Sequence, residues 1–336
     1  MDVNAKPRTV AGLFSGVGGI ELGFQQAGFD VALANEIDPY AATTYRKNHH
    51  HELVEGDIAT LGSGKLPKDL GILTGGFPCQ PFSVAGYRKG FDDERGNVFW
   101  DIERLFVENA PEVVFLENVK NLKGHDSGNT FRTIEASLRK AGYFVDSAVL
   151  NSTTHGNIPQ NRERIYIVAF KSHESFSKFE WPESIPLTTK LSDLIDFQNK
   201  KDDRYYYTAE RPFYDKLVED VTEESTIYQW RRQYVRSNKS GVCPTLTANM
   251  GTGGHNVPLI KTRWGVRKLT PRECFNLMGF PSDFVLPSEL AQSRLYKQAG
   301  NAVVVPVIRR IAERISMSLG VSNESALPER ELARAS

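Results

Sequence analysis

The stretch Thr9–Gly28, "TVAGLFSGVGGIELGFQQAG", decides the fold class of this chain. A short apolar run ends in a glycine-rich turn, and the residues after the turn have helical spacing and a terminal glycine. A strand, a tight turn and a helix in this order open a βαβ unit. Glycines in such a turn allow the backbone to approach a ligand closely. The stretch therefore predicts an α/β protein with a ligand site at the end of its first strand.

The same alternation continues to about residue 170. Apolar, β-branched runs predict strands at 29–36, 69–76, 111–118, 143–150 and 164–170, with helices at 38–48, 98–110 and 129–142. Asp38 is the expected N-cap of its helix and Pro39 its first residue. Strands separated by helices predict a mostly parallel, doubly wound sheet, in which ligands bind outside the carboxyl ends of the strands.

The second half of the chain has a different pattern. From residue 171 to about 258 it is polar and has no βα rhythm, which predicts a second, smaller domain. We expect a catalytic and cofactor-binding domain at 1–178, completed by 290–336, and the smaller domain at 179–289. Thr270 and Pro271 predict the start of a helix that ends at Gly279, and residues 300–319 predict one long amphipathic helix.

Composition sets limits on function. The 336 residues are 40% hydrophobic, and no apolar run approaches the roughly 20 residues that span a bilayer. The N-terminus lacks the apolar core of a signal peptide. The three cysteines, Cys79, Cys243 and Cys274, are far apart, so we expect neither disulfides nor a zinc site, and a cytoplasmic location. We expect no metal: His49–His51 follow a helix in a polar turn, where solvated side chains are typical.

Charge is unevenly distributed along a chain whose 41 basic and 41 acidic residues balance. Residues 225–272 contain no Asp or Glu and include nine Lys or Arg: Arg231, Arg232, Arg236, Lys239, Lys261, Arg263, Arg267, Lys268 and Arg272. A locally basic face on an otherwise acidic body is typical of proteins that bind a polyanion. A solvated loop region that happens to lack acids is the alternative.

Cys79 in "GGFPCQPFS" is the first candidate for chemistry. Pro78 and Pro81 restrict the backbone on both sides of it, as a nucleophile held in place requires. Glu117 ends an apolar strand, where a carboxylate needs a partner or a function. Arg162 and Arg164 precede another strand and are the expected partners. On these residues alone, a buried structural cysteine and a structural Glu–Arg pair remain open.

The glycine turn suggests the kind of cofactor. Glu36, at the end of the second expected strand, suits ribose hydroxyls, and Asp57 suits an adenine amino group. Glu21 stands where a dinucleotide fingerprint requires glycine, which argues against NAD. A smaller nucleoside-bearing cofactor is the expectation.

Together these residues resemble a known family. The blocks "FSGVGG", "NEIDPYA", "GDI", "GGFPCQPFS", "ENV", "QNRERIYIV", "RKLTPRECFNLMGFP" and "GNAVVVPVI" are similar, in order and spacing, to those of DNA (cytosine-5)-methyltransferases of the bacterial restriction–modification type. The resemblance covers the chain except about residues 180–258. It implies the Rossmann-like fold of S-adenosylmethionine-dependent methyltransferases, with 179–289 as a target-recognition domain.

The resemblance also implies roles for individual residues. Cys79 would attack C6 of a cytosine that is flipped out of the duplex, Glu117 would hold or protonate its N3, and Arg164 would hold the base, so that C5 can accept the methyl group. The expected catalytic set is Cys79, Glu117, Arg164, Arg162, Gln80 and Ser83. The expected set for S-adenosylmethionine, and for the product S-adenosylhomocysteine, is Phe14, Ser15, Gly16, Gly18, Gly19, Glu36, Ile37, Asp57, Ile58, Pro78, Val98, Asn301 and Ala302.

Double-stranded DNA is the partner that the resemblance implies, read in the major groove by the acid-free segment. The expected contacts are Arg231, Arg232, Arg236, Lys239, Thr245, Leu246, Asn249, Gly253 and Gly254. We expect a monomer associated with the nucleoid, and a restriction endonuclease acting on the same site without a stable complex. Three residues depart from the family pattern: Gly12 replaces a frequent Asp, Ile37 an aromatic and Ala302 a frequent Ser.

Three alternative functions fit part of the sequence. A tRNA cytosine-5 methyltransferase shares the catalytic blocks, but the sizeable basic segment favours DNA. A catalytically inactive DNA-binding regulator conflicts with the intact set of Cys79, Glu117 and Arg164. A cysteine hydrolase would need a general-base histidine, and His155 is the only histidine near an expected strand end.

Overall fold

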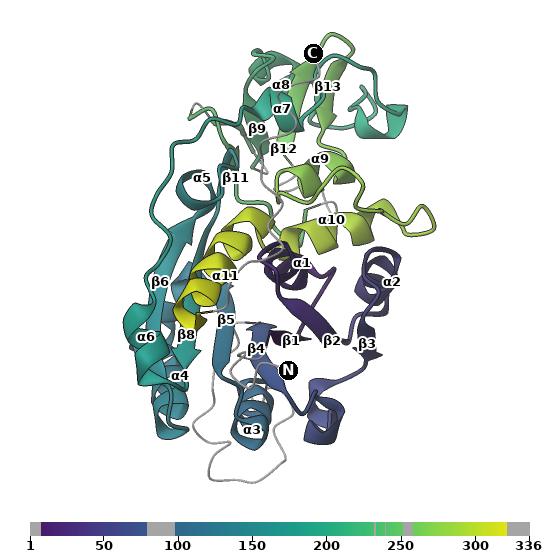
Figure 1. Cartoon of the computed structure of the whole chain (residues 1–336). Helices are drawn as coiled ribbons and strands as arrows, with labels where there is room; N and C mark the ends of the chain where they lie inside the picture. The colour runs from purple at the N-terminus through teal and green to yellow at the C-terminus, as the bar shows by residue number, and fades with distance from the viewer. Residues whose placement is uncertain (1–7, 79–97, 232, 239, 251–257, 321–336) are drawn as a thin grey trace, which may run out of the picture.

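The structure is a computed structural model of the chain, and it describes residues 8–78, 98–231, 233–238, 240–250 and 258–320. A seven-stranded sheet forms the lower body of the molecule and a four-stranded sheet lies at its upper end (Figure 1). The strands of the described residues are β1 (Thr9–Leu13), β2 (Asp30–Glu36), β3 (Glu52–Glu55), β4 (Leu70–Gly76), β5 (Val113–Val119), β6 (Phe144–Asn151), β7 (Gln160–Asn161), β8 (Glu163–Phe170), β9 (Ile227–Trp230), β10 (Val235–Asn238), β11 (Cys243–Pro244), β12 (Pro258–Thr262) and β13 (Gly265–Lys268).

Helices separate the strands of the large sheet, as the sequence predicts. The α-helices of the described residues are α1 (Gly19–Gln26), α2 (Pro39–Asn48), α3 (Val98–Asn109), α4 (Asn129–Lys140), α5 (Ser152–His155), α6 (His173–Lys178), α7 (Leu191–Leu194), α8 (Tyr214–Asp220), α9 (Pro271–Asn276), α10 (Gln292–Asn301) and α11 (Val305–Leu319). The Asp38 side chain caps α2 through the Tyr40 amide, and Thr270 caps α9, both as expected.

The large sheet is mostly parallel. Its strand order is β3-β2-β1-β4-β5-β8-β6. The strands from β3 to β5 run parallel, whereas β8 is antiparallel to both of its neighbours, β5 and β6. This confirms the predicted α/β class. The carboxyl ends of β1, β2, β4 and β5 consequently lie at one edge, together with the amino end of β8.

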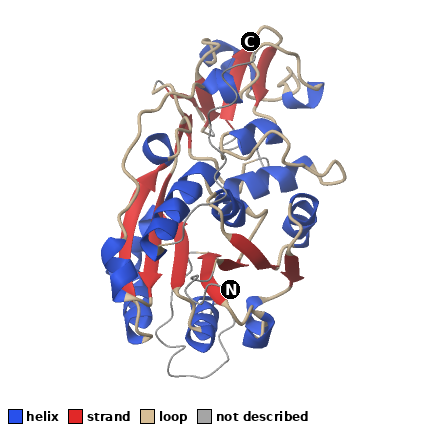
Figure 2. Ribbon diagram, in the orientation of Figure 1, coloured by secondary structure: helices blue, strands red, loops and turns tan. Residues whose placement is uncertain are grey.

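Helices cover both faces of this sheet, and successive residues of each strand point to opposite faces. In β5, Val113 and Phe115 belong to one hydrophobic cluster, and Val114 and Leu116 belong to another. The first cluster includes the buried faces of α1 and α11, and the second those of α3 and α4 (Figure 2). β5 is apolar on both sides because helices pack against both faces of the sheet.

The upper sheet has the order β10-β9-β12-β13 and is antiparallel. Its own hydrophobic cluster, with α8, draws on residues 207–266. Phe275 and Met278 belong instead to the cluster of the large sheet. A two-stranded parallel pairing of β11 with β7 joins the acid-free segment to the residues that lead into β8. The separate core is therefore narrower than the predicted 179–289 segment.

Two local expectations need correction. Residues 300–319 do not form one helix: Gly300 and Asn301 end α10, and α11 begins at Val305 with Pro306 in its first turn. His49 is only 7% exposed, so the expectation of a solvated side chain is wrong for this histidine. Cys243 and Cys274 are free and buried, as expected. None of the helices in the described parts of the chain is long and apolar enough to cross a membrane.

Candidate active site

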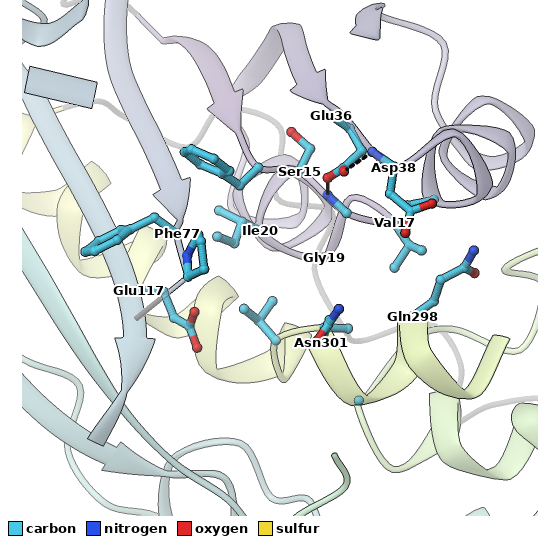
Figure 3. Close-up of a pocket in the computed structure, with 18 of the residues that line it drawn as sticks. Ser15, Val17, Gly19, Ile20, Glu36, Asp38, Phe77, Glu117, Gln298 and Asn301 are labelled. Carbon is cyan, nitrogen blue, oxygen red and sulfur yellow. Dashed lines mark hydrogen bonds between the residues drawn. The ribbon is translucent and has the colours of Figure 1, made fainter. Parts of the chain in front are cut away.

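A pocket of about 330 Å³ lies at the edge where the carboxyl ends of the parallel strands meet (Figure 3). The turn after β1, the end of β2, the residues after β4 and the end of β5 form its floor. Residues 297–303, at the end of α10 and after it, form the opposite wall. Its described lining residues are Phe14, Ser15, Gly16, Val17, Gly19, Ile20, Glu36, Asp38, Ala41, Gly76, Phe77, Pro78, Glu117, Asn118, Val119, Arg162, Arg164, Lys297, Gln298, Gly300, Asn301, Ala302 and Val303.

The turn after β1 is shaped for close approach to a ligand. Phe14 and Gly16 both have positive φ, at 54° and 57°, which bends the backbone sharply, and a Cβ on Gly16 would meet open space. Glu36 holds this turn from the next strand: its two carboxylate oxygens accept the amides of Gly16 and Asp38, each at 2.6 Å. The result is a rigid cradle with an acid beside it, which fits a ribose-bearing ligand.

Asp38 and Lys297 join the two walls of the pocket. The Lys297 ammonium donates to the Asp38 carboxylate at 2.8 Å, connecting α10 to the start of α2. Burial raises the pKa of Asp38, but Lys297 and the Tyr40 amide outweigh that effect and hold it below its ordinary value. Gln298 strengthens the connection, because its side-chain amide donates to the Tyr40 carbonyl and its oxygen accepts from Thr44.

Glu117 and Arg164 form a buried ion pair in the same pocket. Arg164 Nε lies 3.1 Å from Glu117 Oε1, and the two side chains are only 15% and 11% exposed. The pairing follows from the sheet, because β8 runs antiparallel to β5 and aligns the two strand ends. Burial raises the pKa of Glu117 although Arg164 and Arg162 act to lower it. Of the two expected partners of Glu117, Arg164 forms the ion pair, so the prediction is confirmed for Arg164.

Asn118 fixes the approach to the proposed nucleophile. Its side-chain amide donates to the Phe77 carbonyl at 2.9 Å, and Pro78 follows Phe77 at the pocket wall. Gly76 pairs with Glu117 in the ladder between β4 and β5. Cys79, Gln80 and Ser83 lie outside the described residues, but Cys79 is the residue directly after Pro78. The chain therefore leads to Cys79 from a point beside Glu117.

Arg162 acts differently from Arg164. It is 2% exposed, and its guanidinium donates to the carbonyls of Leu246 at 2.8 Å, Gly300 at 3.0 Å and Ala302 at 2.7 Å. These carbonyls belong to the acid-free segment and to the Gly-Asn turn of the pocket. Arg162 lines the pocket, yet its guanidinium already donates to three backbone carbonyls, so it connects the acid-free segment to the pocket wall.

A second hollow, also about 330 Å³, lies between the upper sheet and the residues that lead into β8. It contains three of the predicted DNA contacts, Arg231, Arg236 and Thr245. The complete lining among the described residues is Asn161, Gln229, Arg231, Arg236, Asn238, Pro244, Thr245 and Thr247. Two arginines with amides and hydroxyls, and no carboxylate, form a surface suited to base edges or phosphates.

The structure brings together most of the predicted residues that it describes. In the pocket are Phe14, Ser15, Gly16, Gly19, Glu36, Pro78, Glu117, Arg162, Arg164, Asn301 and Ala302. Gly18, Ile37, Asp57, Ile58 and Val98 do not line it among the described residues. The predicted DNA contacts Arg232, Lys239, Gly253 and Gly254 lie outside the described residues, and Asn249 is described but lines neither hollow.

Several of these residues have other contacts that explain their positions. Asp57 caps a short 3-10 helix through the Ala59 amide. Gly18 has a φ of 89°, and a Cβ there would lie 2.0 Å from His49 Nε2, so glycine is required for packing. Leu246, one of the expected DNA contacts, has a fully buried side chain. Ile37, in contrast, is 59% exposed.

Sequence reasoning did not assign Asn118, Lys297 and Gln298 to the site. Asn118 lies inside the quoted block "ENV", and Lys297 and Gln298 lie within three residues before the block "GNAVVVPVI". The departure at Gly12 also has a physical cause. A Cβ on Gly12 would lie 1.9 Å from Glu21 Oε1, so the Glu21 carboxyl occupies the space that a side chain at position 12 would need.

Comparison with known proteins agrees with this geometry. Residues 9–317 match the C-5 cytosine-specific DNA methylase family. The chain is 58% identical to the Type II methyltransferase M.Bsp6I of a Bacillus species, over 92% of this chain and 99% of that protein. It is 40% identical to M.NlaX of Neisseria lactamica over 93% of this chain and 97% of the relative, and 36% identical to M.HhaI of Haemophilus parahaemolyticus over 91% and 94%.

Solved structures support the fold. The Dnmt2 methyltransferase of S. pombe has a TM-score of 0.72 and 22% identity, covering 93% of this chain and 99% of that chain. The methyltransferase EhMeth of Entamoeba histolytica has a TM-score of 0.74 and 20% identity, covering 94% and 99%. At these identities the likeness extends to the fold alone.

Proposed function

The chain belongs to the C-5 cytosine-specific DNA methylase family, and we propose that it methylates C5 of a flipped-out cytosine in a short duplex site through a covalent bond from Cys79 to C6. The observation that supports this most directly is the buried Glu117–Arg164 pair, which lies beside Gly76 at the start of the segment that leads to Cys79. Such a pair has no solvent role, and it faces a pocket that also holds the glycine cradle.

S-adenosylmethionine is the cofactor of this family, and the pocket fits it. We propose that Glu36 holds the ribose hydroxyls, and that the turn from Phe14 to Gly19 and the wall at Asn301 enclose the remainder. When bound, the cofactor supplies an electrophilic methyl group. The cradle at Gly16, where a Cβ would meet open space, leaves room for close approach.

We propose that residues of this chain carry out the reaction at the cytosine ring. Cytosine C6 is shielded inside a duplex, so the base must leave the stack before Cys79 can reach it. The Cys79 thiolate adds to C6 while Glu117, protonated, donates to N3, and this makes C5 nucleophilic. Burial keeps the pKa of Glu117 raised, which favours the protonated form that this step needs. After C5 takes the methyl group, a base removes the C5 proton, the thiolate leaves C6 and the N3 proton returns to Glu117.

Arg164 holds Glu117 in position and is also placed to contact the base. Its Nη1 donates to the Glu163 carbonyl, and its Nε faces Glu117, so the guanidinium plane is fixed at the pocket. A cation here stabilises the negative charge that develops on the base during thiolate addition.

The relatives also suggest the biological setting. The curated relatives cited above are Type II methyltransferases, and this chain covers 94% or more of each of them. We propose that it protects DNA at the site of a restriction endonuclease with the same specificity, with which it forms no stable complex, and that it acts as a monomer. The hollow with Arg231, Arg236 and Thr245 would read that site.

Bisulfite sequencing of plasmid DNA from cells that express the chain tests the proposal. We expect every copy of one short sequence to contain 5-methylcytosine, and no other site to contain it. In parallel, transfer of tritiated methyl groups to duplex DNA and to tRNA separates a DNA enzyme from an RNA enzyme. Label on tRNA alone, or an unmodified plasmid, would contradict the proposal.

The covalent step needs a separate experiment. Duplex DNA with 5-fluorocytosine at the modified position lacks the proton that must leave C5, so the enzyme should remain attached through Cys79. We expect a band stable to denaturing electrophoresis, absent in Cys79→Ser. A Cys79→Ser protein that still forms the band would remove Cys79 from the mechanism.

A further inference from the structure

Glu21 is a buried acid that the mechanism above does not use. It lies on α1, is only 1% exposed, and neither of its carboxyl oxygens has a well-formed hydrogen bond to a described residue. An acid in such a position is costly, so it needs a reason. A Cβ on Gly12 would lie 1.9 Å from Glu21 Oε1, which places this carboxyl directly at the end of β1.

The Glu21 carboxyl lies immediately behind the cofactor cradle. The Ser15 hydroxyl, 7% exposed and also without a well-formed hydrogen bond to a described residue, would lie 3.0 Å from the same Cβ on Gly12. Ser15 lines the pocket, as do Gly19 and Ile20, the two residues before Glu21 (Figure 3). Ser15 therefore borders both the pocket and the space beside Gly12 that the Glu21 carboxyl occupies.

The charges near Glu21 are negative or neutral. Glu36, across the glycine turn, is a second acid, and Tyr45 and the Ser15 hydroxyl are uncharged. His49 packs against Tyr45 with the two rings tilted, and burial lowers the pKa of His49, so it is neutral near pH 7. Burial raises the pKa of Glu21 to about 7, although the Ser15 hydroxyl lowers it in part, and Glu36 adds to the increase. Glu21 consequently changes charge near neutral pH.

We propose that Glu21 is a positioning residue that discriminates between the charged cofactor and the neutral product by its negative charge. The inference rests on the proposed cofactor. S-adenosylmethionine carries a sulfonium cation, and S-adenosylhomocysteine, left after methyl transfer, does not. An ionised carboxylate beside Ser15 attracts the sulfonium of the first, a charge that the second lacks. Release of product would thus be favoured by the loss of charge that accompanies the reaction.

Isothermal titration calorimetry on the wild type and Glu21→Gln tests this proposal. The substitution keeps the shape of the side chain and removes its charge. At pH 8 we expect S-adenosylmethionine to bind about tenfold more weakly to the variant, as loss of a partly buried charge interaction would give, and S-adenosylhomocysteine to change less than about twofold. The preference of the wild type for S-adenosylmethionine should fall between pH 8 and pH 6, where Glu21 gains a proton.

The amino group of the ligand can also titrate between pH 6 and pH 8. Glu21→Gln binds the same ligand, so comparison with this variant removes the contribution of the amino group. We expect the pH dependence of the affinity ratio to be smaller in Glu21→Gln. A double variant, Gly12→Asp with Glu21→Ala, moves the carboxyl to β1. It should restore the preference, because the shortened side chain on α1 vacates the space beside residue 12 and Gly12 lacks the positive φ that would exclude a side chain.

Each result has one meaning. If both ligands weaken equally in Glu21→Gln, the residue only supports the turn, and the proposal is wrong. If neither affinity changes, the proposal is equally wrong. A wild-type protein that binds neither ligand would contradict the cofactor assignment itself, and this distinguishes failure of the proposed function from failure of the role of Glu21.

Discussion

The pocket at the edge of the large sheet and the hollow beside the upper sheet use charge differently. In the pocket, Glu117 is 9% exposed and is paired with Arg164 at 3.1 Å. In the hollow, Arg236 is exposed and makes no ion pair with a described residue, and the segment around it has no acids. A group that performs chemistry needs a fixed position and a shifted pKa, whereas a group that reads DNA needs a free charge that phosphate or a base edge can reach.

The comparison predicts that changes in the pocket affect turnover and changes in the hollow affect binding. The largest effect is expected for Glu117→Gln, which keeps the shape of the side chain but removes the proton donor for N3. We expect turnover to fall about 10²- to 10³-fold, with DNA affinity within about threefold of the wild type. Measured by tritiated methyl transfer and by gel shift, a Glu117→Gln enzyme with full turnover would remove Glu117 from the chemistry.

A matched control for that variant is Glu163→Gln. Glu163 lies on β8 and pairs with Lys120 at 2.9 Å, but both side chains are about half exposed, at 41% and 54%. Exposed pairs of this kind contribute less than about 1 kcal/mol. We expect Glu163→Gln to keep wild-type turnover and stability. A comparable loss in both variants would mean that the assay reports stability of this sheet edge and not chemistry.

Arg162→Met breaks the connection between the two regions. It leaves the carbonyls of Leu246, Gly300 and Ala302 without their buried donor, which we expect to lower the free energy of unfolding by about 3 kcal/mol. Because these carbonyls belong to both regions, the affinities for cofactor and for DNA should fall together. Chemical denaturation and calorimetry would measure both effects. A variant that loses affinity for DNA alone would show that the two regions are independent.

Arg236→Ala acts on the hollow alone. We expect affinity for the specific duplex to fall about tenfold, as loss of one charged contact to DNA predicts, while the turnover number at saturating DNA stays within about twofold. Arg263→Ala is the matched control, because Arg263 belongs to the same acid-free segment and is exposed but does not line the hollow. Equal losses in the two variants, measured by fluorescence anisotropy, would mean that the effect is one of overall charge.

The smallest expected effect is on the pH dependence of the melting temperature, and it is caused by Glu21 behind the glycine turn. The pKa of Glu21 is raised from 4.5 to about 7 in the folded protein, so between these values the folded state binds more protons than the unfolded chain, and stability falls as pH rises. Glu21→Gln removes this loss of stability at higher pH, because glutamine does not ionise. In the absence of cofactor, we expect the melting temperature of the variant relative to the wild type to rise by a few degrees between pH 5 and pH 8. A difference independent of pH would show that Glu21 is not protonated in the folded state.

The α/β class, most helices and strands, and a pairing of Glu117 with Arg162 or Arg164 could be predicted from the amino-acid sequence alone. These depend on local patterns: apolar runs of β5 and β8, glycine at tight turns, and Asp38 and Thr270 as caps. Short-range steric and solvation effects act between residues that are close in sequence, so a short stretch of sequence is enough to predict them. The recognised blocks also located most of the pocket.

The residues that meet across long distances in the chain could not be predicted, because their contacts depend on the three-dimensional packing. Arg162 binds carbonyls 84, 138 and 140 residues away, and Lys297 reaches Asp38 across 259. Nothing local to Leu246 shows that it is buried, or that Glu21 occupies the space beside Gly12. Burial and electrostatic environment depend on segments that the folded sheet brings together. They set the pKa values and the exposed charges on which the proposed chemistry and DNA reading depend.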